Sequence, residues 1–378
     1  MPDTQPDSPR VTTLELFFDL VFVFTITQLT AVLSHDPSWS GAYRVALMLG
    51  IIFWMYGGYA WLTNAVAVDR LLRRLTLLGG MAGFLLLALA VPQAFDGAGL
   101  TFGLAYLAVV AIHFGMFARS SNLNVVNAMV GLVPFNLFNA TLVLIGGALG
   151  GDAQYVLWTL AFALTWVSPK LIDDSGFEIA PAHFVERHGL VIIIAIGESI
   201  IAVGAGAADL PVDLDLAIAT LLGLALAACL WWSYFGSGEE EAAEHAIADA
   251  PMSARPRLAI NAFGYAFFLL LLGVIAIAAA LKELPVPPFD DLEDAKAVAL
   301  GAGVAVFLLG EAWFRSTLAI GGAPGRALTG VLAVATIPVG IGIGAGAQVL
   351  VLIALFVAML LLAGRSPSPA PDLPTVPN

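Results

Sequence analysis

The stretch LVIIIAIGESIIAVGAGAA, residues 190–208, decides the fold class of this chain. Only one of its side chains, Glu198, carries a charge. An α-helix of about 20 predominantly apolar residues crosses the hydrocarbon core of a bilayer. The stretch therefore predicts a transmembrane helix with a single ionisable side chain near its middle.

The composition of the whole chain agrees with this prediction. Of 378 residues, 60% are hydrophobic and 11% are charged, whereas soluble globular proteins carry about 25% charged residues. These values exclude an ordinary soluble enzyme and a disordered protein, and predict an integral membrane protein in contact with the lipid bilayer. The net charge of −13 argues against a nucleic-acid binder, which needs a basic face. The single cysteine, Cys229, excludes a disulfide framework or a thiolate metal site within one chain, and no cofactor-binding motif is present.

Apolar runs recur along the chain and predict an all-α, polytopic membrane bundle of about twelve transmembrane helices. Ten or eleven spans remain possible, because the glycine-rich residues 340–346 nearly join the last two. The N-terminal tail is residues 1–12, and the Ser/Pro-rich residues 364–378 predict a disordered tail. The expected helices are 13–33, 43–63, 74–95, 100–118, 125–149, 154–171, 186–207, 214–235, 258–281, 295–314, 326–344 and 347–363.

Basic residues give the expected orientation. If twelve helices alternate in direction, one side of the membrane receives 12 of the 15 lysines and arginines, and the other receives Arg44, Lys282 and Lys296. The positive-inside rule then places both termini in the cytoplasm. The longest cytoplasmic segment, residues 236–257, is acidic and is expected to be an exposed loop.

The two halves of the chain resemble each other. ELFFDLVFVFTITQL, residues 15–29, aligns with ERHGLVIIIAIGESI, residues 186–200, and further helix pairs match in the same order. We expect two six-helix repeats, residues 13–171 and 172–363, in the same orientation and related by an axis along the membrane normal.

Glu198 is the first candidate for a functional group, because an ionisable side chain inside a membrane is costly and marks a functional site by default. The overlay of the halves places Thr27 and Gln28 opposite Glu198 and Ser199. We therefore expect a substrate or ion site between the first and seventh helices. The alternative is a protonated glutamate that only hydrogen-bonds a neighbouring helix.

Glu15 and Asp19 are four residues apart and share one face of the first helix. In the functional interpretation they line the cytoplasmic approach to Glu198. In the structural interpretation they form ion pairs with arginines at the ends of other helices. The arginines considered are Arg73, Arg119, Arg257 and Arg315.

Other polar side chains have weaker interpretations. His113 and Glu311 are possible members of a proton relay. Three asparagines are expected to hydrogen-bond between helices at about 0.6 kcal/mol each: Asn136, Asn139 and Asn261. His183 and His188 with Glu186 have the spacing H-x-x-E-x-H, in which the histidines are five apart rather than the four that a zincin requires, so no metal site is predicted.

Four stretches resemble the bacterial low-temperature-requirement A family of membrane proteins. They are residues 15–24 (ELFFDLVFVF), 183–200 (HFVERHGLVIIIAIGESI), 231–235 (WWSYF) and 303–315 (GVAVFLLGEAWFR). The resemblance implies a multi-pass protein of the bacterial inner membrane. It supplies no substrate, because the family name describes growth in the cold. One departure is in the ninth helix, where the family's Y-x-H-L-P pattern is replaced by Tyr265 followed by AFFL.

The sequence leaves three function classes open. The repeat and Glu198 favour a secondary transporter or ion-coupled carrier of an unidentified small solute or ion. The sequence FFDLVFVF, residues 17–24, weakly resembles the first helix of a potassium-channel family built from six-helix units, which would make the protein a cation channel. The third class is a membrane scaffold or enzyme of lipid homeostasis.

Overall fold

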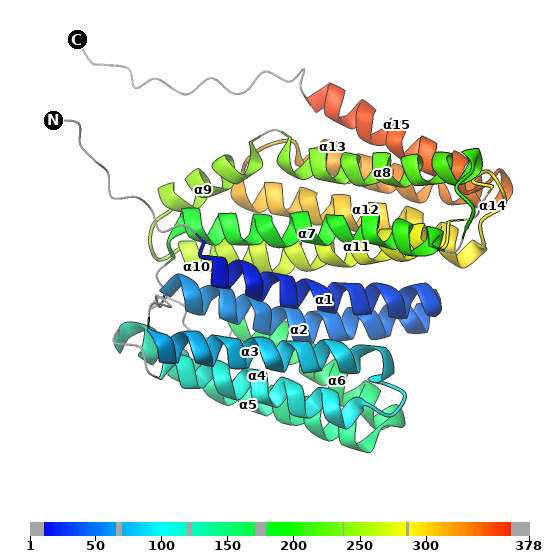
Figure 1. Cartoon of the computed structure of the whole chain (residues 1–378). Helices are drawn as coiled ribbons and strands as arrows, with labels where there is room; N and C mark the ends of the chain where they lie inside the picture. The colour runs from blue at the N-terminus through cyan, green and yellow to red at the C-terminus, as the bar shows by residue number, and fades with distance from the viewer. Residues whose placement is uncertain are drawn as a thin grey trace, which may run out of the picture.

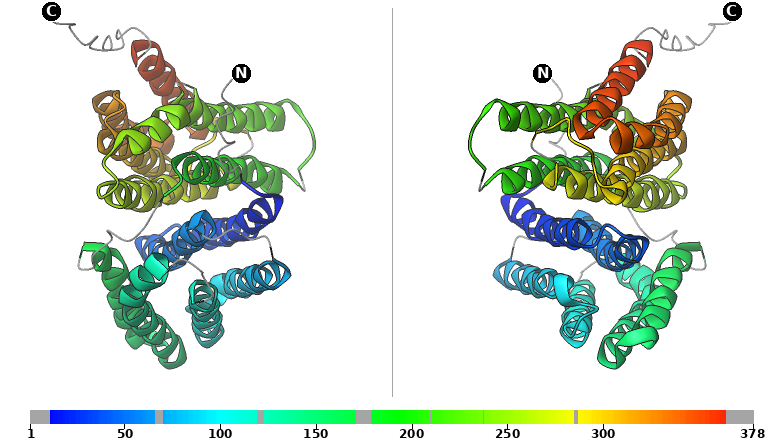
Figure 2. Two further views of the ribbon diagram at one scale, coloured as in Figure 1. Left: turned by 90° about the vertical axis from the view of Figure 1, so that its left-hand side faces the viewer. Right: turned by 90° about the vertical axis from the view of Figure 1, so that its right-hand side faces the viewer.

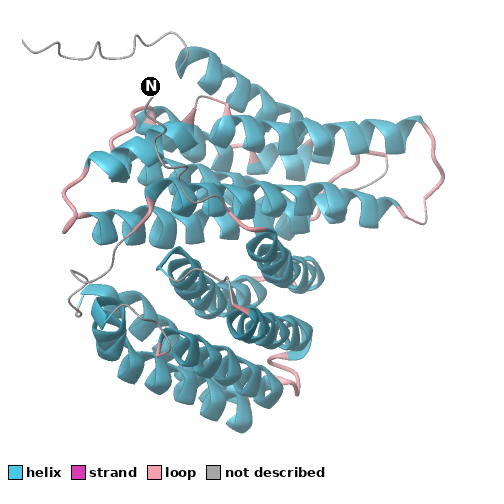
Figure 3. Ribbon diagram, turned by 60° about the vertical axis from the view of Figure 1, so that its left-hand side comes forward, coloured by secondary structure: helices cyan, strands magenta, loops and turns pink. Residues whose placement is uncertain are grey.

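The computed structural model describes residues 11–65, 70–118, 123–170, 179–208, 210–236, 238–284 and 287–363. All regular secondary structure in these residues is helical (Figure 3). Eleven of the helical segments are long and apolar enough to cross a membrane. The prediction of an all-α, multi-pass membrane bundle is therefore confirmed. Residues 1–10 and 364–378, which include most of the predicted tails, lie outside the described residues.

The described residues of the first half form six α-helices. These are α1 (Thr13–His35), α2 (Trp39–Ala65), α3 (Leu71–Ala90), α4 (Gly99–Phe117), α5 (Leu123–Leu149) and α6 (Gly151–Val167). Two short 3₁₀ turns, Val91–Gln93 and Ser168–Lys170, follow α3 and α6.

The second half is more irregular. It contains α7 (Pro181–Ala207), α8 (Leu214–Phe235), α9 (Glu239–Asp249), α10 (Arg255–Ala259), the π-helical segment Ile260–Ala266, α11 (Phe267–Lys282), α12 (Asp294–Leu318), α13 (Ala323–Val334), α14 (Ile337–Gly342) and α15 (Ala345–Ala363). The helices α10 and α11 and the π-helical segment form one continuous rod of 28 residues.

The long helices lie side by side and alternate in direction (Figure 1). We call the end of the bundle at which α1 begins the proximal end, and the opposite end the distal end. Helices α1–α6 form one side of the bundle and α7–α15 the other, as the end-on views show (Figure 2). The two sides meet where α1 and α2 pack against α7 and α11. This central contact brings the first and seventh helices together.

The count of twelve spans stays a prediction. The expected span 154–171 corresponds to α6, which has 17 residues and is not one of the eleven long apolar segments. Seventeen residues are about the minimum for a helix that crosses a bilayer.

The acidic segment 236–257 is not the exposed loop that its composition predicted. Residues 239–249 form the helix α9, which packs against α7. The side chain of Glu239 is buried, and its carboxylate forms an ion pair of 2.7 Å with Arg315 that compensates its charge. A short acidic helix with a neutralised carboxylate therefore closes the proximal end of the second half.

The expected helix 326–344 is interrupted. It is divided into α13 and α14, and the break precedes Pro338, which has no backbone N–H for a helical hydrogen bond. Gly344 follows with a φ of 131°, a conformation that side chains other than glycine rarely adopt. This glycine lets the chain turn directly into α15.

Candidate functional site

The start of α1 is fixed by a capping box. The Thr12 side chain accepts a hydrogen bond from the Glu15 backbone N–H, and Glu15 Oε2 accepts one of 2.8 Å from the Thr12 backbone N–H. Such reciprocal bonds satisfy amide groups that the first turn of a helix leaves unpaired. They also hold the Glu15 side chain in one orientation, with its second oxygen directed toward α7.

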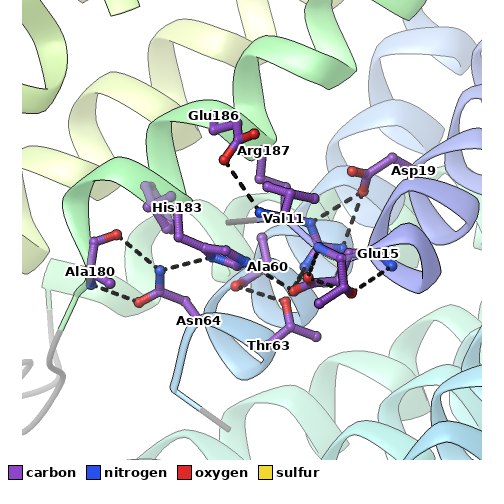
Figure 4. A network of polar contacts seen from close by, with 12 residues as sticks. Val11, Glu15, Asp19, Ala60, Thr63, Asn64, Ala180, His183, Glu186 and Arg187 are labelled. Carbon is purple, nitrogen blue, oxygen red and sulfur yellow. Dashed lines mark hydrogen bonds and ion pairs between the residues drawn. The ribbon is translucent and has the colours of Figure 1, made fainter. Parts of the chain in front are cut away.

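That second oxygen, Glu15 Oε1, faces two basic side chains of α7 (Figure 4). His183 Nε2 is 3.2 Å away and Arg187 Nη1 is 3.7 Å away. Glu15 and His183 are almost completely buried. The sequence LELFFD of α1 thus places a carboxylate where the first turns of α7 supply its partners.

Arg187 is the centre of this cluster. Its guanidinium is fully buried and donates to Asp19 Oδ1 through Nη2 at 3.2 Å and through Nε at 3.3 Å. Nη1 donates to the Thr63 hydroxyl of α2. The guanidinium also lies 5.3 Å from the ring centre of Phe18, within the range of a cation–π contact.

Asp19 is fully buried, and its two carboxylate oxygens differ in their hydrogen bonds. Its Oδ1 accepts from Arg187 and from the Tyr56 hydroxyl, at 3.0 Å. Its Oδ2 has no hydrogen-bond partner among the described residues. A buried carboxylate oxygen without a donor is costly, and this atom is therefore the open acceptor of the cluster.

The protonation of His183 follows from its neighbour Asn64. The Asn64 amide is oriented by the backbone of residue 180: Oδ1 accepts from Ala180 N–H at 2.9 Å, and Nδ2 donates to the Ala180 carbonyl at 3.1 Å. The same Nδ2 lies 3.2 Å from His183 Nδ1, which must then be the acceptor. The remaining proton is on Nε2, and it is donated to Glu15.

The charges of the cluster formed by Glu15, Asp19, His183 and Arg187 do not balance. With both carboxylates ionised and His183 neutral, it holds two negative charges and one positive charge among the described residues. Uptake of one proton or one monovalent cation would balance it.

A second polar contact lies deeper in the bundle. Thr27 of α1 donates a hydrogen bond of 2.6 Å to Glu198 Oε2 of α7. Glu198 is 3% exposed, and the neighbouring Ser199 is fully buried with a hydroxyl that has no partner among the described residues. Lys282, at the distal end of α11, interacts electrostatically with Glu198. A carboxylate and a hydroxyl that has no partner among the described residues thus lie together where the two halves touch.

Gln28 does not join this contact. It is half-buried and makes no hydrogen bond to Glu198. Of the pair expected opposite Glu198 and Ser199, the structure therefore brings only Thr27 into place.

The two residues suggested for a proton relay lie in separate environments. Glu311 of α12 accepts from Arg326 of α13 and from Ser233 of α8. Arg326 also lies 3.5 Å from Glu239, which pairs with Arg315. This second cluster, Glu239, Glu311, Arg315 and Arg326, contains two carboxylates and two guanidinium groups and is balanced.

His113 of α4 is in the first half. It is 1% exposed, and neither ring nitrogen is hydrogen-bonded to a side chain of the described residues. The structure does not bring His113 and Glu311 together.

Arg187 is the partner that the sequence did not identify. The structural interpretation of the sequence pairs Glu15 and Asp19 with arginines among Arg73, Arg119, Arg257 and Arg315 instead. The available signal was the position of Arg187 within the first turns of the helix that aligns with α1. Parallel helices that begin at the same end of a bundle place their first turns side by side, which is where α1 and α7 meet.

The remaining ionisable side chains of α7 point in different directions. Glu186 is exposed and accepts from the Val11 N–H at 3.3 Å. His188 Nδ1 lies 2.8 Å from its own helix backbone at Phe184. No group of three or more His, Cys, Asp and Glu side chains within the described ranges is placed to hold a metal ion. Asn136 and Asn139 make the expected interhelical bonds, to Trp54 and Thr165.

Residues 10–364 match the model of the bacterial low temperature requirement A protein (LtrA) family. The chain belongs to the LtrA family. An uncharacterised protein of Rhizobium meliloti (strain 1021) is 27% identical over 322 residues, which cover 82% of this chain and 78% of the relative. No solved structure matches the chain. The LtrA match covers both halves and both polar contacts, and with the apolar helices it makes this chain a multi-pass protein of a bacterial membrane.

Proposed function

We propose that this LtrA protein is an ion-coupled secondary transporter with Glu198 at the centre of its binding site. The observation that carries the proposal is the hydrogen bond from Thr27 to Glu198. It joins an ionisable group in the middle of one helix to the corresponding helix of the other half. Transporters built from repeats commonly place substrate and coupling-ion sites at such an interface.

The packing of the helices supports a six-plus-six repeat. In the first half, α1 contacts α3, α3 contacts α4, and α4 contacts α5. In the second half, α7 contacts α11, α11 contacts α12, and α12 contacts α13. The contact of α2 with α6 likewise corresponds to that of α8 with α15. A repeat of this kind has twelve crossings, of which α6 is the sixth.

The proximal end is cytoplasmic in this proposal, because the basic residues gather there and because α1 begins and α15 ends on that side. Glu15, Asp19, His183 and Arg187 then line the cytoplasmic approach. Their excess negative charge gives the cluster an affinity for a proton or a cation, and Asp19 Oδ2 is the acceptor that has no donor.

Glu198 would act as the coupling group. In the empty carrier it is neutral, because a charge in the membrane interior is costly. A bound cation would stabilise its ionised form, and a proton would replace the cation as the site changes exposure. The Ser199 hydroxyl would contact the solute, and the charge of Lys282 would favour the ionised form of Glu198.

Purified protein in proteoliposomes that contain a pH-sensitive dye tests the proposal. Panels of ions and small solutes are added under imposed proton gradients. We expect at least one of them to produce saturable, proton-dependent flux in the wild type. The same flux should be absent from Glu198→Gln, which keeps the shape and hydrogen-bonding capacity of the side chain without its titratable charge.

The matched control is Glu186→Gln, the same substitution at an exposed position of the same helix. It should transport like the wild type. Full activity in a normally folded Glu198→Gln protein would overturn the proposal. Single-channel currents would identify a cation channel. Altered lipid composition in a deletion strain, without flux from any solute, would identify the scaffold or lipid enzyme.

A further inference from the structure

A cavity separate from the Thr27–Glu198 contact lies between the two halves near the proximal end. Helices α2, α4, α5, α6 and α7 and the π-helical segment enclose it, and its volume is about 110 Å³. Its wall is mainly aromatic and aliphatic, with Phe53, Trp61, Phe184 and Phe263 among the lining side chains. Such a wall accommodates a hydrocarbon chain.

A second, more polar cavity adjoins the first and shares Pro169, Ile260 and Tyr265 with it. Its remaining lining residues are Lys170, Arg257 and Asn261. Lys170 and Arg257 are exposed, and neither is paired with a carboxylate of the described residues. Two cations thus stand at the mouth of an apolar chamber.

Two further features mark this place as a built site. The π-helical segment Ile260–Ala266 contributes to both cavities, and π-helical turns are frequent at functional sites. Inside the first cavity, Asn136 accepts from Trp54 through Oδ1, which leaves its amide N–H groups without a partner among the described residues. These groups can donate to an ester or carbonyl oxygen of a ligand.

We infer that the two cavities form one binding site for an anionic phospholipid. An acyl chain lies in the aromatic cavity, the ester region faces Asn136, and the phosphate lies at Lys170 and Arg257. Basic pockets between transmembrane helices bind anionic headgroups in this way. The charge of the mouth and the apolar wall behind it select a lipid over a water-soluble anion. The inference goes beyond transport, because lipid binding does not require flux.

Native mass spectrometry of the purified full-length protein tests this site. Delipidated protein is titrated with phosphatidylglycerol or with phosphatidylcholine of the same acyl chains. We expect at least tenfold tighter binding of phosphatidylglycerol. Lys170→Gln and Arg257→Gln should each weaken it about fivefold, since the attraction is about 1 kcal/mol for each cation. Lys296→Gln, which removes a cation near the distal end, should bind like the wild type.

Occupancy of the cavity is tested with two glycine substitutions. A β-carbon at Gly57 or at Gly115 meets no atom within 4 Å, but only Gly57 lines the cavity. Gly57→Leu should fill the chamber and lower binding of phosphatidylglycerol at least tenfold, whereas Gly115→Leu should leave it unchanged. Size-exclusion profiles of the variants establish that they are folded.

Two results of the lipid titrations would overturn the inference. One is equal affinity for the two lipids in the wild type. The other is unchanged binding of phosphatidylglycerol in both Gly57→Leu and Arg257→Gln. Inorganic phosphate serves as the competitor: if it displaces the lipid at millimolar concentration, the site belongs to a soluble anion and the lipid assignment is wrong. Because none of these measurements uses transport, they are independent of the proposed function.

Discussion

The Thr27 hydroxyl donates a hydrogen bond of 2.6 Å to the Glu198 carboxylate across the contact between α1 and α7. Thr27 belongs to the first half of the chain and Glu198 to the second, 171 positions further along the sequence. The bond therefore depends on how the two halves are packed. Any rearrangement that separates α1 from α7 must break it, and this makes the pair a sensitive point for mutation.

Thr27→Val removes the hydroxyl and keeps the shape of the side chain. We expect the free energy of unfolding in detergent to fall by about 0.6–1.7 kcal/mol, the range measured for interhelical hydrogen bonds in membranes. In a Glu198→Ala background the same substitution should cost almost nothing, because the acceptor is absent. Thr141→Val, at an exposed position of α5, is the control. If the effects of Thr27→Val and Glu198→Ala on the free energy of unfolding were additive, the hydrogen bond between the two side chains would be contradicted.

Arg187→Gln should be far more damaging. It leaves Glu15 and Asp19 buried without their cation, and removal of one partner from a buried ion pair typically costs about 3–5 kcal/mol. We expect low expression and a large drop in melting temperature. Addition of Asp19→Asn should recover part of the loss, because it removes one of the two stranded charges. Failure of the second substitution to help would show that Arg187 acts through packing on Phe18 and Tyr56 instead.

Asp19→Asn alone distinguishes a functional carboxylate from a structural one. An asparagine keeps an acceptor at the position of Oδ1, where Arg187 and Tyr56 donate, and it changes the oxygen that has no partner. We expect the melting temperature to change by less than about 2 °C, while proton-dependent flux in proteoliposomes is lost. A strongly destabilised protein would show that Asp19 is required for folding.

Glu311→Gln should have the opposite profile. The cluster of Glu239, Glu311, Arg315 and Arg326 is electrically balanced, and the substitution leaves the buried Arg326 with one partner fewer. We expect a marked fall in melting temperature. The protein that does fold should transport at the wild-type rate per molecule. A normal melting temperature together with loss of transport would instead indicate that Glu311 takes part in a proton relay.

The orientation of the bundle is tested with single cysteines. Native Cys229 is replaced by alanine, and cysteines are introduced at Ser253, near the proximal end, and at Asp291, near the distal end. Both positions are exposed. With cytoplasmic termini, an impermeant thiol reagent added to intact cells should label the Asp291 variant and not the Ser253 variant. The reverse pattern would invert the topology.

The sequence predicted the fold class and the contact between α1 and α7. Long apolar runs determine the first, because lipid leaves helices as the available structure. The aligned polar pairs Thr27–Gln28 and Glu198–Ser199 indicated the second. The prediction stopped at the level of helices: Thr27 reaches Glu198 and Gln28 does not, because a register in an alignment does not fix the rotation of a helix about its axis.

Other features could not be read from composition. Residues 239–249 have the acidic composition of a solvated loop. They nevertheless form α9, which packs on the bundle with Glu239 in an ion pair with Arg315. This pairing joins segments 76 residues apart. The partner of Asp19 was missed for the same reason, since Arg187 is separated from it by 168 residues. Pairing over such distances depends on tertiary packing, which a local pattern does not contain.

Glu15 serves two structures at once. One carboxylate oxygen closes the cap of α1 with Thr12, and the other faces His183 and Arg187. A proton or cation that binds the Glu15 carboxylate reduces its negative charge. It therefore also weakens the hydrogen bond that Glu15 Oε2 accepts from the Thr12 backbone N–H at the start of α1. Binding of an ion to the cluster is therefore thermodynamically coupled to fraying of the first turn of α1. Amide hydrogen exchange at the start of α1 would report the occupancy of the cluster.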